Sequence, residues 1–337
     1  MAFRGWETEK LVLPDGRVVD SICPVIISAS RATDIPAFFP EWFFNRLRAG
    51  YVRWTNPFNA GQKQYLSFSR MRFIVFWSKN PGPILPYLSG LDDAGINYWF
   101  QFTLNDYEAE GIEPQLPSLG ERIEVFRRLA DKVGAERVIW RFDPLILSET
   151  LTVDELLRRI TLIASRLQGY TRKLVISFAD IDVYRKVRNN LAKQPYQYRE
   201  FTTEEMILFS ERLAALNREW GFEIASCAEP ADLTRYGIRR NRCIDDNLMI
   251  ELFRDDLKLM SFLGYEADQF DLFNGSHQSN MKDKGQRKEC GCIVSKDVGM
   301  YNTCQHLCAY CYANVSSKAV ENNVCKNVSD SESIISD

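Results

Sequence analysis

Six apolar runs separated by helical patterns are the feature that most limits the folds open to this chain. Each run is continuous in residues such as Val, Ile and Phe instead of alternating with polar residues. Continuous runs are typical of strands that are covered on both faces, as in a parallel sheet, and the helices between them supply the crossovers. The predicted strands fall within residues 24–34, 72–81, 97–106, 137–145, 173–180 and 222–230.

Three of the intervening segments carry clear helix signals. Residues 118–134 place apolar side chains at helical spacing, begin with a Ser and end at a Gly. Residues 152–167 and 202–221 repeat this pattern behind a Thr that is closely followed by acidic residues. The alternation of strands and helices predicts an α/β fold, a TIM-like parallel β/α barrel that is full or partial.

The barrel is expected to form one domain over residues 1–314, because no stretch rich in Pro, Gly or Ser divides it. Residues 315–337 are polar and rich in Ser, which predicts a flexible tail.

Charge and hydropathy exclude several classes of protein. Lys and Arg number 42 and Asp and Glu 45, a net charge of −3, whereas proteins that grip duplex nucleic acid are usually basic. The N-terminal residues lack the apolar core of a signal peptide, and no apolar run is long enough to span a membrane. We therefore expect a cytoplasmic protein, and in a reducing compartment clustered cysteines indicate metal or redox sites.

Polar residues follow the predicted strands. In a parallel barrel the C-terminal ends of the strands meet at one face, where active sites form. Any one of these residues is equally compatible with a loop cap or a surface ion pair, so their recurrence is the stronger signal. The candidates are Ser30, Asp34, Lys79, Gln101, Arg141, Asp143 and Glu229.

The segment 288–314 holds five of the nine cysteines. Cys304, Cys308 and Cys311 are spaced C-x-x-x-C-x-x-C, and a loop of three cysteines leaves one iron of a four-iron cluster open to another ligand. A structural zinc site is the alternative, and His306 or the Cys290/Cys292 pair could complete it. Zinc sites usually pair two C-x-x-C units at a distance, so the spacing favours iron–sulfur.

The sequence "CQHLCAYCYAN" resembles the cluster loop of the radical S-adenosylmethionine superfamily, with Tyr310 at the aromatic position before the last cysteine. The following "YA" is similar to spore photoproduct lyase and its relatives. The resemblance implies a four-iron four-sulfur cluster on Cys304, Cys308 and Cys311, whose open iron binds S-adenosylmethionine. Reductive cleavage of that cofactor releases methionine and a 5′-deoxyadenosyl radical.

The cluster loop comes last in this chain, whereas it follows the first barrel strand in that superfamily. The segments that start at residues 25, 73, 99 and 138 resemble the second to fifth strands, and "EPQLP" with the Arg that follows resembles a motif behind the fourth strand. The resemblance therefore implies a circularly permuted barrel, a layout that an uncharacterised bacterial domain family shares. Permutation is tolerated where chain termini lie near one another at the surface.

The same resemblance implies roles for several strand-end residues. Lys79 matches a lysine that pairs with the carboxylate of S-adenosylmethionine, and Ser30 and Asp34 lie where its amino group or ribose would be held. Ser30 and Asp34 are also ordinary turn residues. Gln101 is a further candidate for the cofactor, and Arg141, Asp143 and Glu229 are candidates for catalytic contacts.

Four more cysteines, Cys227, Cys243, Cys290 and Cys292, form a second candidate group. They would hold a second iron–sulfur cluster or a zinc ion. The alternative is that some of them are buried apolar residues, although a C-x-C pair seldom serves packing.

The leading hypothesis is a radical S-adenosylmethionine enzyme that abstracts hydrogen from a small molecule, nucleoside or peptide. A reductase, flavodoxin or ferredoxin would supply the electron. The second hypothesis is a zinc-stapled barrel that binds without redox chemistry, and the third is an iron–sulfur electron carrier. P-loop, Rossmann and H-E-x-x-H motifs are absent from the sequence, so the functions that they mark lose support.

Overall fold

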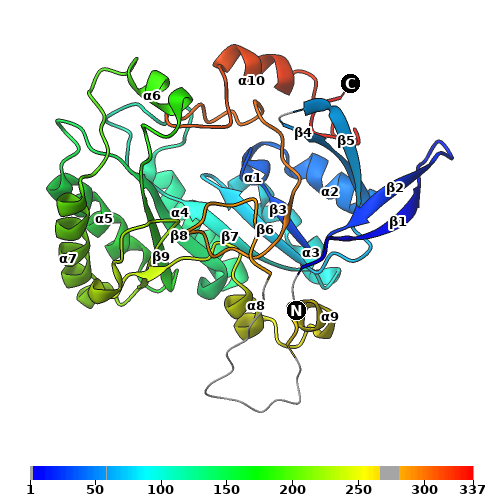
Figure 1. The fold of residues 1–337 in the computed structure, drawn as a ribbon, viewed down its shortest axis with the longest axis horizontal. Coiled ribbons are helices and arrows are strands. Elements are labelled where there is room, and N and C mark those ends of the chain that lie inside the picture. Colours follow the sequence, from blue (N-terminus) through cyan, green and yellow to red (C-terminus); the bar gives the residue numbers. More distant parts are fainter. Residues whose placement is uncertain (1–2, 58, 266–280, 337) are drawn as a thin grey trace.

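A computed structural model describes residues 3–57, 59–265 and 281–336 (Figure 1). Its main element is a sheet of eight strands in the order β11-β10-β9-β8-β7-β6-β3-β12. Every neighbouring pair in this sheet is parallel. The strands are β3 (Ile26–Ala29), β6 (Phe73–Ser78), β7 (Asn97–Thr103), β8 (Val138–Leu145), β9 (Lys173–Phe178), β10 (Glu223–Ser226), β11 (Arg239–Arg240) and β12 (Lys296–Asp297).

The predicted α/β fold with a parallel sheet is confirmed, because each of the six apolar runs contains one strand of this sheet. Within the described ranges no pairing joins β11 to β12, so the sheet is open and no closed barrel is present. None of the helices described has both the length and the apolar character that a membrane crossing requires.

The three predicted helices are also confirmed, as α4 (Leu119–Val133), α5 (Val153–Leu167) and α7 (Thr203–Trp220). Each begins at the expected polar residue: the side chains of Ser118, Thr152 and Thr202 accept N–H groups of the first turn. The other helices are α1 (Ile35–Phe38), α2 (Pro40–Ala49), α3 (Ser89–Asp93), α6 (Arg185–Leu191), α8 (Asp246–Leu252), α9 (Leu257–Leu263) and α10 (Ser317–Val324).

Both faces of the sheet are buried, as continuous apolar strands require. Successive side chains of a strand point to opposite faces. Phe100 and Trp140 lie on one face and belong to a core that includes α4, α5 and α7. Trp99 and Ile139 lie on the other face and pack with α8, α9 and residues 281–294. We call this second face the α8–α9 face.

A second, smaller sheet was not predicted. It has the order β1-β2-β5-β4 and lies beside the main sheet, with the β1–β2 hairpin projecting from the molecule (Figure 1). Its strands are half exposed and contain no continuous apolar run, which is the signal that identified the strands of the main sheet. They are β1 (Glu7–Val12), β2 (Val18–Cys23), β4 (Tyr51–Asn56) and β5 (Asn59–Ser67).

The C-terminal segment is packed where the sequence predicted a flexible tail. After α10 the chain lies against α2 and β4: Trp42 donates its indole N–H to the carbonyl of Ser331 (2.9 Å). The N–H of Arg53 donates to the carbonyl of Glu332 (2.8 Å), and Ile334 is buried in the main core. A side chain of this segment also bonds to the protein, because the Tyr51 hydroxyl donates to Glu332 Oε1 (2.8 Å). The segment is therefore packed and not frayed.

We expect Ile334→Ala to lower the free energy of unfolding by about 2–5 kcal/mol, the usual cost of deleting a buried Ile side chain. Val328→Ala is the matched control, because Val328 lies in the same segment and is 55% exposed. Urea denaturation followed by circular dichroism measures both variants. Equal midpoints for the two variants would show that this segment is not packed in solution.

Candidate functional site

Residues 298–314, which we call the cysteine loop, lie against the segments that follow β3, β6 and β7. The N–H of Val298 donates to the carbonyl of Ser28 (3.1 Å) and continues the pairing of β12 with β3. The N–H of Ala309 donates to the carbonyl of Ile112 (2.8 Å), beyond β7. The loop thus lies at the C-terminal ends of parallel strands, where α/β proteins place their ligands.

The three thiols of the cysteine loop act on one another. Cys308 is buried, and Cys304 and Cys311 are partly buried. Burial raises the pKa of Cys304 to about 12, with a smaller contribution from Cys311. Burial also raises the pKa of Cys308 well above its ordinary value, and the other two thiols add to the shift. Without a bound cation all three thiols would be protonated at neutral pH.

Backbone N–H groups face two of these sulfur atoms. Those of His306 and Asp34 lower the pKa of Cys304 and so offset part of the effect of burial. Those of Asn314 and Ala313 act in the same way on the pKa of Cys311. Hydrogen bonds to sulfur stabilise thiolates and tune iron–sulfur clusters, so this loop suits thiolate ligands.

Among the described residues no group of three or more His, Cys, Asp or Glu side chains is positioned to hold a single metal ion. This finding bears on mononuclear sites. In a four-iron cluster each thiolate binds a different iron, so its ligands need not converge on one point.

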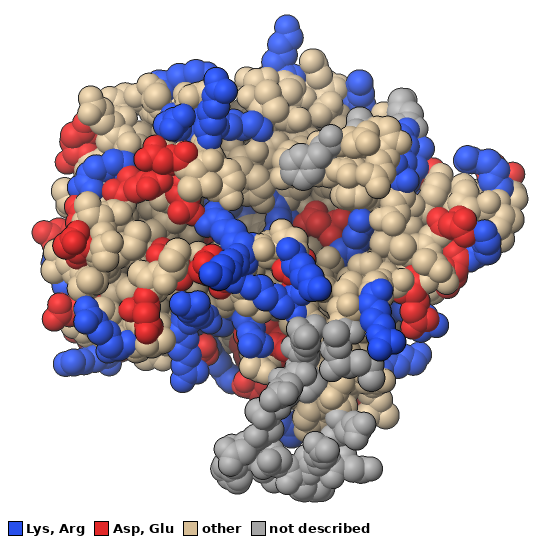
Figure 2. All heavy atoms as spheres, in the orientation of Figure 1, with Lys and Arg blue, Asp and Glu red and all other residues tan. Residues whose placement is uncertain are grey.

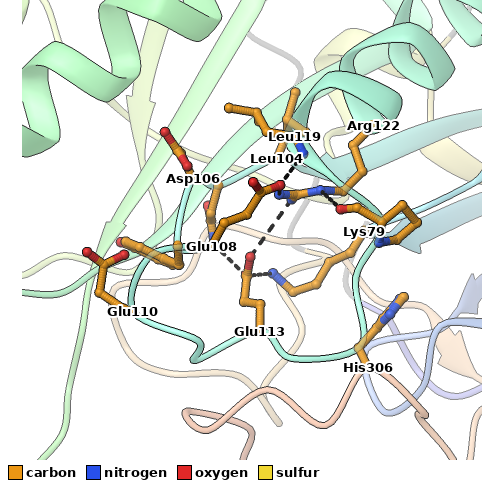
Figure 3. Close-up of polar contacts among 12 residues, drawn as sticks. Lys79, Leu104, Asp106, Glu108, Glu110, Glu113, Leu119, Arg122 and His306 are labelled. Carbon is orange, nitrogen blue, oxygen red and sulfur yellow. Dashed lines mark hydrogen bonds and ion pairs between the residues drawn. The ribbon is translucent and has the colours of Figure 1, made fainter. Parts of the chain in front are cut away.

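A buried carboxylate, Glu113, connects the cysteine loop to β6. Its Oε1 accepts from Lys79 Nζ (2.8 Å) and Asn105 Nδ2 (3.1 Å), and its Oε2 lies 3.8 Å from Arg122 (Figure 3). Lys79 Nζ also donates to the Tyr310 hydroxyl (2.8 Å), which donates in turn to Glu113. Burial alone would raise the pKa of Glu113, but Lys79 and Arg122 hold it below its ordinary value.

Lys79 remains a cation in this environment. Burial would lower its pKa, but the charge of Glu113 and its hydrogen bond with the ammonium raise it. An ammonium group has three N–H donors, and the contacts with Glu113 and Tyr310 use two of them. The structure thus brings this predicted cofactor residue next to the cysteine loop with one donor left over.

Asp34 connects β3, β6 and the cysteine loop. Its Oδ1 accepts the N–H of Ala37 and caps α1, as the turn interpretation predicted. Its Oδ2 accepts the N–H of Lys79 (2.7 Å) and hydrogen-bonds to His306 Nε2 (2.7 Å). Asp34 therefore positions the loop and the Lys79 backbone, and both of its carboxylate oxygens already have partners.

Ser30 is held by Asp297, at the end of β12. One carboxylate oxygen of Asp297 accepts from the Ser30 hydroxyl (2.6 Å) and the N–H of Gly299 (2.9 Å). The other accepts from the Ser28 hydroxyl (2.7 Å) and the N–H of Arg31 (2.8 Å). Four donors on one partly buried carboxylate fix the start of the cysteine loop to the end of β3.

The approach of the loop to β3 leaves no room for a side chain at residue 299. A Cβ atom on Gly299 would lie 1.8 Å from Ser30 Oγ, so Gly299→Ala should force the two segments apart. We expect a loss of about 1–3 kcal/mol in the free energy of unfolding, as for other overpacked positions. Gly120→Ala is the control, because that Cβ would meet nothing within 4 Å. If thermal melting does not distinguish the two variants, the loop is not seated on β3.

A second polar group lies on the α8–α9 face. Arg141 Nη1 donates to Gln101 Oε1 (3.2 Å) and to Cys243 Sγ (3.0 Å), and its Nε donates to Asp143 (3.1 Å). The structure thus brings together three of the predicted residues, Gln101, Arg141 and Asp143, with one of the cysteines. Gln101 also donates to the carbonyl of Cys243 (2.9 Å), so both of its amide atoms have partners within the protein.

The four cysteines of the second candidate group lie together. Cys227 Sγ is 3.6 Å from Cys243 Sγ, and the N–H of Cys243 donates to Cys292 Sγ (3.2 Å). A hydrogen bond with the Cys292 thiol lowers the pKa of Cys290. The structure therefore gathers residues that are far apart in the sequence.

Glu229 hydrogen-bonds within its own loop, two residues after Cys227. Its Oε1 accepts the N–H of Ala231 (3.0 Å) in its own loop. Burial raises the pKa of Glu229, and that N–H offsets part of the shift. These contacts are those of a loop residue.

Sequence reasoning did not single out Glu113, Asn105 or Asp297 as site residues. The "EPQLP" motif contains Glu113, so the signal for this residue was present. His306 was considered only as a zinc ligand, whereas its Nε2 bonds to Asp34. For Asn105 and Asp297 we find no sequence signal beyond their positions after strands.

Figure 2 shows one face of the molecule, on which Lys and Arg side chains lie both in the middle and at the margins, interspersed with Asp and Glu. The mixture of signs agrees with the small net charge of the chain, −3.

The comparisons with known proteins yield one family. The model of a domain family of unknown function, DUF1848, matches residues 26–313. No curated protein and no solved structure matches the chain. The matched range contains all eight strands of the main sheet and the three cysteines of the loop.

Proposed function

We propose that this chain, which belongs to the DUF1848 family of domains of unknown function, is a radical S-adenosylmethionine enzyme. Cys304, Cys308 and Cys311 would hold a four-iron four-sulfur cluster. S-adenosylmethionine would bind beside it at the C-terminal ends of β3 and β6.

The observation that carries this proposal is the setting of the three thiols. They come from one loop at the C-terminal ends of parallel strands, are buried or partly buried, and two of them receive backbone N–H groups. A cation, Lys79, lies beside Cys308 and offsets part of the charge that thiolates would bring into a buried place. These features fit a cluster, which requires thiolate ligands away from water.

The order of the strands supports the barrel part of the proposal. If β12 is counted first, the strands follow one another in space as β12, β3, β6, β7, β8, β9, β10 and β11. The cysteine loop then follows the first strand, as it does in the superfamily that it resembles. We therefore infer a partial TIM-like barrel that is circularly permuted.

Polar atoms that lack a partner near the loop support a bound ligand. Thr33 Oγ1, His306 Nδ1 and Asn314 Oδ1 are buried without a hydrogen bond within the described residues. Buried polar atoms without partners are costly, so a ligand that satisfies them would gain affinity. Together with the remaining donor of Lys79, they could meet the amino acid portion of S-adenosylmethionine.

The residues of the chain would have the following roles in the reaction. The cluster, when bound, supplies the electron that cleaves S-adenosylmethionine to methionine and a 5′-deoxyadenosyl radical. Lys79 would attract the cofactor carboxylate, while Glu113 holds the lysine in place. Asp34 would fix the position of His306, and Arg141 and Asp143 would be candidates for contacts with the substrate. The aromatic side chains of the strands, which are buried on both faces of the main sheet, would exclude water from the radical.

The test uses protein that is purified and reconstituted without oxygen. We expect about four irons per chain and the formation of 5′-deoxyadenosine when dithionite and S-adenosylmethionine are added. Iron without 5′-deoxyadenosine would favour an electron carrier. Zinc in the cysteine loop without iron would favour a stapled binding protein.

A further inference from the structure

The α8–α9 face of the main sheet changes in character along its strands. Near the start of the strands its side chains are apolar, as in Val75, Trp99 and Ile139, and they pack with α8, α9 and residues 281–294. Side chains two positions further along a strand point to the same face. They form a layer at the C-terminal ends of the strands, which we call the C-terminal layer: Ser28, Trp77, Gln101 and Arg141.

Most polar groups of the C-terminal layer bond to the protein itself. Trp77 Nε1 donates to Ser28 Oγ (3.0 Å). Arg141 donates to Gln101 (3.2 Å) and pairs with Asp143. The hydrogen-bonding capacity of the layer is therefore largely used within the chain, and the charge of Arg141 is already offset.

Arg31, two residues after β3, is different. Its guanidinium lies over the ring of Trp77, with Cζ 4.9 Å from the ring centroid. No hydrogen bond or ion pair joins this guanidinium to another residue that the structure describes, and its Nη2 is buried without a partner. A buried donor without an acceptor is costly, so a ligand that supplies the acceptor gains affinity.

The backbone of Arg31 is held on both sides. Its N–H donates to the carboxylate of Asp297 (2.8 Å), and its carbonyl accepts from the hydroxyl of Tyr312 in the cysteine loop (2.8 Å). Asp297 makes no ion pair with the guanidinium, because its oxygens accept the backbone N–H and three other donors instead. The side chain is thus positioned between the cysteine loop and the C-terminal layer.

The chemistry of this side chain selects one class of ligand. A guanidinium group is always charged, and its planar fork of N–H groups matches a carboxylate or a phosphate. Stacking on an indole ring fixes the plane of the guanidinium and leaves the N–H groups at its edge free to donate. Arg31 is only partly buried, so part of the residue remains accessible to solvent.

We propose that Arg31, stacked on Trp77, binds the anionic group of a small molecule, a carboxylate or a phosphate. The molecule would lie between the C-terminal layer and the cysteine loop. Its assignment as the substrate rests on the proposed function, because the cluster that starts the reaction would lie in that loop. The anion site itself does not depend on the proposed function.

The test is a calorimetric titration of the purified, reduced protein with inorganic phosphate and with acetate, at constant ionic strength. We expect saturable binding of at least one anion, and an affinity lower by about tenfold or more in Arg31→Gln, which loses a charge-assisted hydrogen bond. Arg31→Lys keeps the charge but not the fork, so it should lose less affinity. Arg17→Gln is the control, because the Arg17 side chain is 64% exposed on the β1–β2 hairpin, and it should bind as the wild type does.

The two anions distinguish the possible sources of the charge. Binding of phosphate alone indicates a phosphate-bearing ligand, and binding of acetate indicates a carboxylate. Equal affinities in wild type and Arg31→Gln, or no saturable binding of either anion, would overturn the proposal.

Reconstituted protein separates this proposal from the proposed function. If S-adenosylmethionine displaces the bound anion, Arg31 serves the cofactor, and its assignment to the substrate is wrong. If Arg31 binds an anion in protein that forms no 5′-deoxyadenosine, the anion site stands and the radical chemistry fails.

Discussion

Cys308→Ala is expected to reduce the iron content of reconstituted protein from about four per chain to near zero. It should also abolish the formation of 5′-deoxyadenosine from S-adenosylmethionine and dithionite. Cys308 is the middle cysteine of the loop and is buried, whereas Cys304 and Cys311 are partly buried. Losing one of three thiolates therefore leaves the cluster with too few ligands.

Cys325→Ala, which removes an exposed thiol, is the control for this prediction and should leave both measurements unchanged. Iron, sulfide and product are measured on the same anaerobic samples. If Cys308→Ala keeps its iron and still forms 5′-deoxyadenosine, the cysteine loop is not the site of the cluster.

Glu113→Gln should lower the free energy of unfolding by about 3–5 kcal/mol, the cost of breaking a buried ion pair. The substitution keeps the size of the side chain but removes the negative charge between Lys79 and Arg122. The side chains of both partners are largely buried, with 16% and 1% exposed, so two cations would be left without their shared counter-charge. Denaturation in guanidinium chloride at pH 7 measures the loss.

The matched control is Glu108→Gln, on the exposed side of the same arginine. Glu108 also lies 3.8 Å from Arg122, but its side chain is 50% exposed, so the change should cost less than about 1 kcal/mol. Equal losses for the two variants would refute a special role for the buried carboxylate.

The pH dependence of the Glu113 contribution follows from the direction of its pKa shift. Lys79 and Arg122 hold the folded-state pKa of Glu113 below its ordinary value, against the effect of burial. The contribution is therefore fully present above the unfolded-state pKa, about 4.3, and is lost as the pH falls through the lower folded-state pKa. The difference between wild type and Glu113→Gln should be constant from pH 7 to about pH 5 and shrink below that.

Local patterns predicted the main elements well. The strands of the main sheet carry continuous apolar runs because both faces are buried, and Ser118 and Thr202 start their helices with reciprocal hydrogen bonds. These signals depend on residues a few positions apart, so a single sequence contains them. The small sheet and the packed C-terminal segment lack such signals, because half-exposed strands and polar contacts look like loop sequence.

The parallel α/β architecture and the spacing of the three loop cysteines can be read from residues that lie close together in the sequence. Which side chains meet depends on the three-dimensional fold. Glu113 joins Lys79 across 34 residues, and Ser28 and Ser30 meet Asp297 from the other end of the chain. Cys227 and Cys243 approach Cys292 because β11 and β12 form the two edges of one sheet. Such contacts depend on how the strands are ordered in space, and no local pattern of residues encodes that order.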